Sequence, residues 1–122
     1  MKAIFINSKE KTVTDILLDG HKPMLQQWYA LIGCDRVEQC HCMKEHNHSI
    51  LVDEDGFLKL TDQSTFFYYQ GAFQPYAGNG IVSAVDFLGN TIDVDVTAEE
   101  IKKNITFYSY DQINSKILLP EF

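Results

Sequence analysis

The sequence predicts a single α+β domain, a mostly antiparallel β-sheet with two short helices on one face. Its 122 residues are the length of one domain. Short β-branched and aromatic segments alternate with turn residues, and only two segments carry helix signals. With 45% hydrophobic and 22% charged residues, the composition is typical of a globular protein that buries its own core.

The first third of the chain predicts a hairpin followed by a helix. Residues 2–7 and 11–18 are rich in β-branched and aromatic side chains, and polar residues separate them. Pro23 suits the first position of a helix because its missing N–H has no partner there anyway. Apolar residues then recur at helical spacing until Gly33, a suitable C-terminal stop. A helix of about ten residues should therefore lie on the sheet.

The middle of the chain predicts further strands joined by turns. Residues 35–43 and 48–53 are expected strands with a polar turn between them. Asp55 and Gly56 tolerate the positive φ of a two-residue hairpin turn, which would lead into a strand over 57–60. For residues 65–69 periodicity does not decide between a strand and a helical turn. The glycine- and proline-containing residues 71–79 are expected to be a loop.

The last third predicts two strands, a capped helix and a final strand. Residues 80–87 are an expected strand, and residues 91–96 alternate strictly between apolar and polar side chains. Thr97 and Glu100 form a capping box that begins a short helix ending near Asn104. The final strand covers 105–110. The tail 111–122 is apolar enough to dock on its own domain or on another subunit of an oligomer.

Charge limits the classes of partner. The chain has 10 basic and 17 acidic residues, a net charge of −7, and its one arginine is Arg36. Binding to nucleic acid depends on neutralising phosphates with a basic face, so direct nucleic-acid binding is not expected. No apolar run is long enough to span a membrane, and the N-terminus lacks the apolar stretch of a secretory signal.

The three cysteines, Cys34, Cys40 and Cys42, are predicted to be free thiols in the cytosol of a host cell. Cys40 and Cys42, with His46 and His48, are candidate zinc ligands that could converge across a strand, turn and strand. One residue between the cysteines is fewer than structural zinc sites use. The alternative is a hairpin with buried cysteines and exposed turn histidines, and no cofactor is predicted.

No motif for a catalytic nucleophile or for a phosphate-binding loop is present, so the chain is not expected to be an enzyme. The densest chemical feature is a run of aromatic rings between Phe66 and Tyr76, followed by glycines. Aromatic faces stack on bases, and glycine-rich loops present backbone N–H groups to phosphates. The alternatives are that the rings form the core or cover a protein interface. The candidate ligand-binding residues are Arg36, Tyr68, Tyr69, Phe73, Tyr76, Gly78, Asn79 and Gly80.

Four short motifs in this order resemble an uncharacterised family of small bacteriophage and mobile-element proteins. They are Met1-Lys2-Ala3 with Lys11-Thr12-Val13-Thr14, Ile32-Gly33-Cys34-Asp35-x-Val37, Val52-Asp53-Glu54-Asp55-Gly56-x-Leu58-Lys59, and Ala77-Gly78-Asn79-Gly80-Ile81-Val82. The resemblance covers residues 1–96 and implies an α+β domain with an accessory role in a mobile element. It implies no catalytic residue.

These observations lead to the hypothesis of a non-catalytic binding protein that counters host defence by sequestering a small nucleotide-like signal. Arg36 or a lysine would balance the charge of the ligand, and a homo-oligomer could pool residues from two subunits. The rival hypothesis is an acidic protein–protein inhibitor or DNA mimic whose face of Asp93, Asp95, Glu99 and Glu100 steers it toward a basic host protein. The third hypothesis is a structural module stabilised by zinc.

Overall fold

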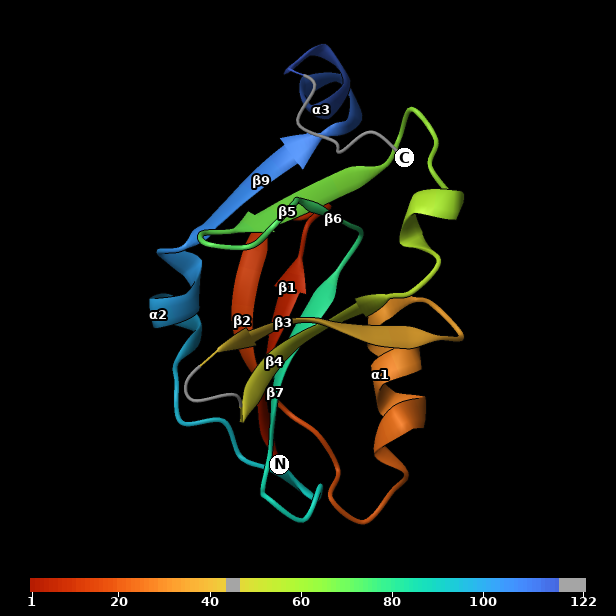
Figure 1. Ribbon diagram of the computed structural model, residues 1–122. Coiled ribbons are helices and arrows are strands. Elements are labelled where there is room, and N and C mark those ends of the chain that lie inside the picture. The colour runs from red at the N-terminus through yellow and green to blue at the C-terminus, as the bar shows by residue number, and fades with distance from the viewer. Residues whose placement is uncertain (44–46, 117–122) are drawn as a thin grey trace.

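The computed structural model describes residues 1–43 and 47–116 and confirms an α+β fold built on antiparallel strands (Figure 1). Strands dominate because most apolar segments are short, β-branched or aromatic. No helix among the described residues is long and apolar enough to cross a membrane. The elements are β1 (Lys2–Asn7), β2 (Thr12–Leu17), α1 (Met24–Ile32), β3 (Val37–Met43), β4 (His48–Asp53), the 3₁₀ turn η1 (Gly56–Leu58), β5 (Thr65–Tyr69), β6 (Tyr76–Ala77), β7 (Gly80–Val85), β8 (Thr91–Ile92), α2 (Ala98–Lys102), β9 (Ile105–Ser109) and α3 (Tyr110–Lys116).

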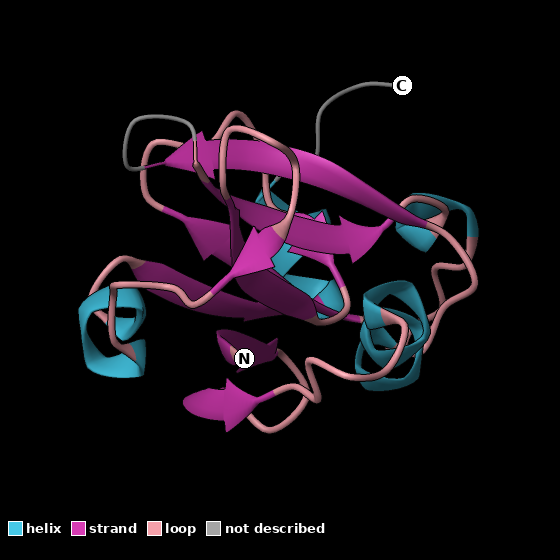
Figure 2. Ribbon diagram, turned by 90° about the horizontal axis from the view of Figure 1, so that it is seen from below, coloured by secondary structure: helices cyan, strands magenta, loops and turns pink. Residues whose placement is uncertain are grey.

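The strands form two sheets where the sequence predicts one. The first sheet has the order β2-β1-β7-β4-β3, with β8 paired to the end of β7. The second sheet has the order β6-β5-β9, and β5 joins segments from distant parts of the chain. Figure 2 shows the stacked strands with helices to either side.

Side chains on the two faces of the first sheet enter two separate cores, because successive residues of a strand point in opposite directions. One core lies between the two sheets and contains the fully buried Ile4, Ile50 and Val82 together with Phe67 of β5. The other lies under α1, where Ala3, Leu51 and Ile81 are buried. A third cluster, with Phe66 and Ile113, lies on the outer face of the second sheet under α3.

Both predicted helices form, but the expectation that they share one face of the sheet is wrong. α1 ends at Gly33, whose φ of 80° allows its N–H to reach the Tyr29 carbonyl at 2.8 Å. In α2 the Thr97 Oγ1 accepts the Glu100 N–H at 3.2 Å, as the capping box predicts. α1 packs on the core under the first sheet, whereas Ile101 of α2 packs in the core between the sheets, so the two helices cover opposite faces.

Some predicted boundaries differ from those observed. Residues 56–58 form a 3₁₀ turn instead of leading into a strand, and the strand predicted over 91–96 is paired only at Thr91–Ile92. Beyond Ile92 the side chains still alternate between buried and exposed, as the apolar–polar pattern predicts: Val94 is buried while Asp93 and Asp95 are exposed. Tyr110, predicted as the end of the last strand, begins α3, and residues 111–116 of the predicted docking tail continue this helix, which buries Ile113. Residues 117–122 lie outside the described residues.

Candidate functional site

A polar cleft of about 350 Å³ lies beside Asn79, where the β1–β2 turn, the end of α1, the segment around η1 and the β6–β7 connection meet. Its volume is in the range of small-molecule sites. The residues that line it are mostly polar or small. They are Lys9, Ile32, Gly33, Asp53, Gly56, Lys59, Thr61, Gln63, Ser64, Thr65, Ala77, Gly78 and Asn79.

The orientation of Asn79 is fixed by a bond to the β1–β2 turn. Its Oδ1 accepts the backbone N–H of Ser8 at 3.0 Å. Ser8 is 1% exposed, and its hydroxyl lies 2.7 Å from the Thr65 Oγ1. Because Oδ1 is engaged, the Nδ2 group of Asn79 is the free end of the amide, and no described residue accepts a hydrogen bond from it. The wall of the cleft therefore contains a hydrogen-bond donor, the Asn79 amide, whose orientation is fixed by Ser8.

Two lysines and one carboxylate give the cleft its charge. The ammonium of Lys59 lies 2.8 Å from the Asp53 Oδ2, and this hydrogen bond raises the pKa of Lys59. Lys9 is exposed on the β1–β2 turn and forms no ion pair with any described residue. One positive charge in the cleft is thus balanced and one is not. This arrangement favours an anionic group over a cationic one.

The predicted glycines lie at or near the cleft, but their backbone N–H groups are not all available to a ligand. Gly78 lines the cleft with a φ of 85°, and its N–H donates to the Thr65 carbonyl at 2.8 Å. Gly80 belongs to β7 and is buried against Phe67. Contacts to a phosphate would therefore come from the side chains of Lys9, Lys59 and Asn79 rather than from a backbone loop.

The predicted aromatic residues do not line this cleft. Tyr76 is 5% exposed and packs against Phe67, with ring centroids 5.6 Å apart. Tyr68 and Phe73 line a different hollow of about 250 Å³. Tyr69 lines another hollow, beside α2. The structure separates the aromatic half of the predicted site from its glycine half, and the rings divide between core and surface.

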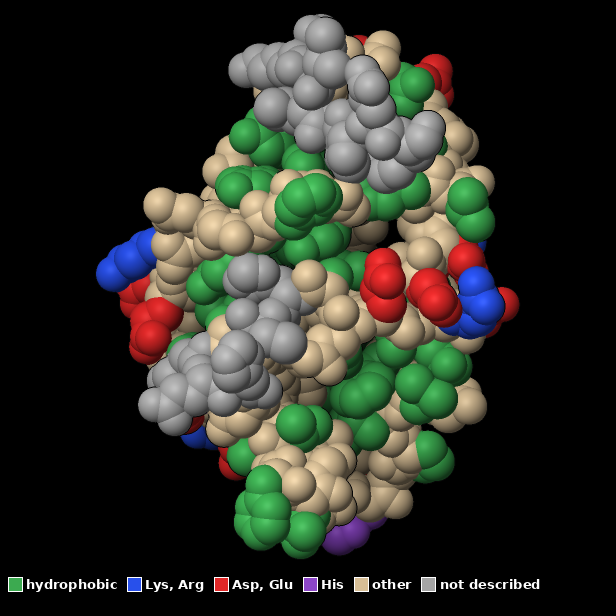
Figure 3. Space-filling model, in the orientation of Figure 1, with side chains coloured by type: hydrophobic (Ala, Val, Ile, Leu, Met, Phe, Trp, Pro, Cys, Tyr) green, Lys and Arg blue, Asp and Glu red, His purple; other side chains and the backbone are tan. Residues whose placement is uncertain are grey.

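Arg36 lies outside the cleft lining, in an exposed cluster of charges. Its Nη2 and Nε lie 2.8 and 3.1 Å from the two carboxylate oxygens of Asp55, and its Nε lies 3.3 Å from Glu54. The guanidinium lowers the pKa of Asp55 through this bidentate hydrogen bond. Figure 3 shows these acidic and basic side chains gathered on the right of the visible face.

The candidate zinc ligands have other partners where they are described. The Cys40 Sγ donates to the Ile50 carbonyl at 3.2 Å. His48 is 1% exposed, so the expectation of an exposed turn histidine is wrong for this residue. Its Nε2 accepts the Asp95 N–H at 3.1 Å. The side chain of Cys42 and all of His46 lie outside the described part of the chain, and no group of three potential ligands occurs within it.

The carboxylates proposed for an acidic face also have structural partners. Asp93 accepts the Lys2 N–H at 2.8 Å, and the backbone N–H of Asp95 donates to the His48 Nε2 at 3.1 Å. Glu100 completes the capping box, and Glu99 is exposed in the first turn of α2. Asp93 and Asp95 thus anchor the irregular segment between β8 and α2.

Sequence reasoning did not identify Ser8, Lys9 or Lys59 as site residues. Ser8 and Lys9 lie in the β1–β2 turn and Lys59 lies just after η1, and the local pattern of both segments is that of an ordinary polar connection. Only the pairing of distant strands brings these two segments together. Comparison with protein-family models, with curated proteins and with solved structures gave no match to this chain.

Proposed function

We propose that the protein binds a small nucleotide-like ligand without transforming it, and holds the phosphate of that ligand in the polar cleft beside Asn79. The observation that carries the proposal is the Asn79 amide. Its Oδ1 is held by Ser8, and its Nδ2 is left without a described partner at the wall of a cleft that contains Lys9.

The chemistry of the cleft supports an anion as the bound group. An amide donor whose orientation is already fixed loses little conformational entropy when a ligand binds, and a lysine adds a mobile positive charge. Lys59 lines the same cleft and its side chain is 50% exposed, so its ammonium adds positive charge near a bound phosphate while it stays on Asp53, whose side chain is only 11% exposed. In the mobile-element setting that the resemblance implies, stoichiometric binding of this kind would sequester a host signal.

The test is isothermal titration calorimetry with AMP, ADP-ribose and a cyclic dinucleotide, with adenosine as the ligand that lacks phosphate. We expect at least one phosphate-bearing ligand to bind with one site per chain and adenosine to bind far more weakly. The recovered ligand should be unchanged when it is analysed by chromatography. Failure of all the ligands to bind at millimolar concentration overturns the proposal, and turnover of a ligand overturns its non-catalytic part.

Two variants locate the site. Asn79→Asp keeps the acceptor for Ser8 but replaces the amide donor by a negative charge, and Lys9→Gln removes the unpaired ammonium. A hydrogen bond to a charged group contributes roughly 1.5–3 kcal/mol, so each variant should weaken binding by about tenfold or more. Lys11→Gln, in the same turn but outside the cleft lining, is the matched control and should bind as the unaltered protein does.

A further inference from the structure

The turn over residues 61–64, just before β5, contributes Thr61, Gln63 and Ser64 to the lining of the polar cleft. Its own side chains close this turn. The Thr61 N–H donates to the Ser64 Oγ at 2.9 Å, and the Gln63 N–H donates to the Thr61 Oγ1 at 3.1 Å. The Ser64 N–H also donates to the Thr61 carbonyl at 3.1 Å. The two hydroxyl oxygens are therefore held in place by the backbone of the turn.

The side chains of this turn keep hydrogen-bonding capacity for a ligand. A hydroxyl group has one hydrogen to donate and two lone pairs to accept with. In Thr61 and Ser64 a backbone N–H takes one lone pair of each oxygen, and no described residue accepts either hydroxyl hydrogen. The Gln63 Nε2 lies 3.4 Å from the Asp62 Oδ1, and its Oε1 accepts no hydrogen bond from a described residue. The turn thus presents uncharged groups that can both donate and accept.

Thr65 joins this turn to the wall of the cleft that holds Asn79. The Thr65 hydroxyl lies 2.7 Å from the Ser8 Oγ, and its carbonyl accepts the Gly78 N–H at 2.8 Å. Ser8 is the residue that orients the Asn79 amide, and Gly78 directly precedes Asn79. A phosphate bound at the Asn79 Nδ2 therefore has the uncharged hydrogen-bonding groups of the turn beside it.

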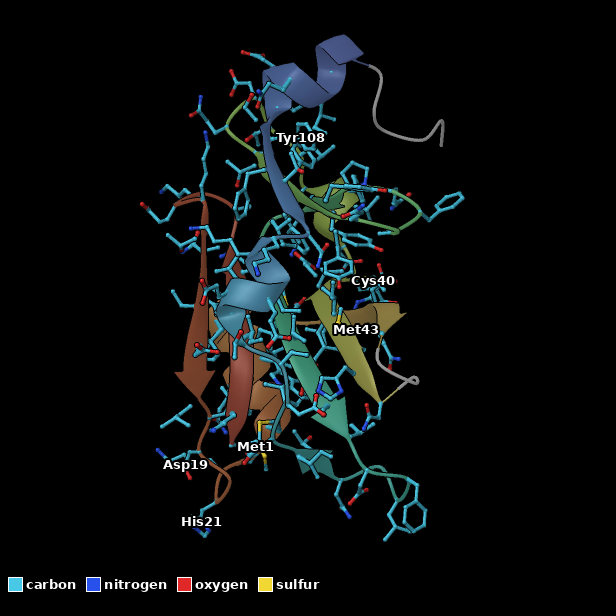
Figure 4. The ribbon with its side chains drawn as sticks, turned by 90° about the vertical axis from the view of Figure 1, so that its left-hand side faces the viewer. Met1, Asp19, His21, Cys40, Met43 and Tyr108 are labelled. Carbon is cyan, nitrogen blue, oxygen red and sulfur yellow. The ribbon has the colours of Figure 1, made fainter. Side chains whose placement is uncertain are left out.

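The cleft offers no ring on which a nucleotide base can stack. None of the described residues that line it is aromatic, and its apolar side chains are those of Ile32 and Ala77. Stacking on aromatic side chains is a main source of affinity for bases. The rings of Tyr68, Phe73 and Tyr108 line a separate hollow that shares no lining residue with the cleft. Figure 4 shows Tyr108 on β9, in the second sheet. The cleft is therefore suited to the part of a nucleotide that is not the base.

We propose that the cleft recognises a sugar phosphate, with the phosphate at Asn79 and Lys9, the sugar hydroxyls on the turn over residues 61–64, and any base left in solvent. This inference rests on the proposed function and names the part of the ligand that the same cleft selects. Sugar hydroxyls both donate and accept, as the hydroxyls of Thr61 and Ser64 do. The volume of about 350 Å³ is at the small end of the range of ligand pockets, roughly 300–1,000 Å³, so a compact ligand fills it. A free sugar phosphate and the ribose phosphate of a nucleotide share this chemistry.

The test compares ribose 5-phosphate, AMP and inorganic phosphate by isothermal titration calorimetry on the whole chain, with phosphorus NMR for inorganic phosphate where its affinity is low. Ribose 5-phosphate and AMP should bind within about threefold of each other, because the base adds no contact in the cleft. Inorganic phosphate should bind about tenfold more weakly or less tightly still, because it forms none of the hydrogen bonds to the turn.

One variant separates the sugar contacts from the phosphate contacts. Gln63→Ala removes an exposed side chain of the turn and should weaken ribose 5-phosphate by about threefold or more, while the affinity for inorganic phosphate stays unchanged. Asn79→Asp should weaken both ligands. Gln70→Ala, an exposed glutamine just after β5 and outside the cleft lining, is the matched control and should change neither affinity.

The outcomes distinguish this inference from the proposed function. If AMP binds about tenfold tighter than ribose 5-phosphate or more, the base is recognised, and the inference is overturned while the proposed function stands. If ribose 5-phosphate binds no tighter than inorganic phosphate, the cleft selects phosphate alone, and the inference is again overturned. An unchanged affinity of Gln63→Ala for ribose 5-phosphate overturns the placement of the sugar on the turn. Failure of every phosphate-bearing ligand to bind at millimolar concentration overturns the proposed function and this inference with it.

Discussion

Gly80 packs directly against the ring of Phe67: a Cβ built on Gly80 would lie 2.7 Å from the Phe67 Cζ and 3.1 Å from its Cε1. The sequence suggested that the aromatic run and the following glycines line one ligand pocket. These two residues do meet, but in the core between the two sheets, where Phe67 is fully buried. The glycine is required there because the ring occupies the space of a side chain.

Gly80→Ala should therefore destabilise the fold. The added methyl must displace a buried ring, and overpacking of this kind costs roughly 1–3 kcal/mol. The measurement is urea unfolding followed by the fluorescence of Trp28, the one tryptophan, which lies in α1 and packs against the core under that helix. Gly20→Ala, in a turn where nothing lies within 4 Å of the added atom, is the control. Equal stability of the two variants would contradict the close packing of Phe67.

Tyr76→Phe should weaken the link between the two sheets. The Tyr76 hydroxyl donates to the Cys40 carbonyl at 3.0 Å, and burial raises the pKa of Tyr76, so the donor stays protonated over the ordinary pH range. Loss of this bond leaves a carbonyl at the β3 bulge between Gln39 and His41 without its partner, at a cost of about 1–2 kcal/mol.

The control for this hydroxyl is Tyr68→Phe. Tyr68 of β5 is only half-buried, and its hydroxyl donates at 3.1 Å to the carbonyl of Ala72, in the loop that follows the same strand. Urea unfolding should show a smaller loss for this variant than for Tyr76→Phe. The reverse order would mean that the inter-sheet bond does not stabilise the fold.

Glu38→Gln should stabilise the protein at neutral pH. Partial burial, followed by the charges of Glu54 and Asp53, raises the pKa of Glu38. The folded state therefore holds the Glu38 proton more tightly than the unfolded state does. Its contribution to stability is lost as the pH rises from the ordinary glutamate pKa through the raised value. Because the side chain is largely exposed, the gain at neutral pH should be only a few tenths of a kcal/mol.

The stability difference between Glu38→Gln and the unaltered protein should vanish well below the ordinary pKa of glutamate, where both side chains are neutral. Thermal unfolding across a pH series measures it, and Glu10→Gln, on the exposed β1–β2 turn, serves as the control. A difference that stays constant with pH would show that packing rather than charge is responsible.

Thr97→Ala should destabilise the start of α2. The Thr97 Oγ1 accepts the Glu100 N–H at 3.2 Å and also lies 3.3 Å from the Glu100 carboxylate. Replacing an N-cap threonine by alanine costs about 1 kcal/mol. Thr97→Ser keeps the hydroxyl and should unfold in urea close to the unaltered protein. If both variants lose the same stability, the methyl group rather than the cap is what matters.

The first hairpin, α1 and the start of α2 form where the neighbouring residues in the sequence predict them. The antiparallel strands on either side of Ser8 to Lys11, the helix that ends at Gly33 and the capping box of α2 are each specified by residues within one or two turns of each other. The alternation of Asp93, Val94 and Asp95 likewise predicted which side chains are buried, although the strand itself ends at Ile92.

The candidate site was only partly predictable. Asn79 and Gly78 were expected at a pocket and do line the cleft, but the rings expected beside them lie elsewhere. The error has a physical cause. In a strand of five residues, neighbouring rings point to opposite faces, so Phe67 enters the core between the two sheets while Phe66 enters the cluster on the outer face of the second sheet. A run of aromatic residues in a sequence does not predict which face of the sheet will be buried, and so does not predict which rings will be exposed.

The amino-acid sequence alone determined the α+β class, the main strands, two of the three helices within residues 1–43 and 47–116, and the residues at their ends, because these depend on interactions between near neighbours. The second sheet and the cleft were decided only by tertiary structure. The bond from Ser8 to Asn79 joins residues 71 positions apart. Such a contact arises when strands choose partners according to which apolar faces can be buried together, and this choice is a property of the whole chain.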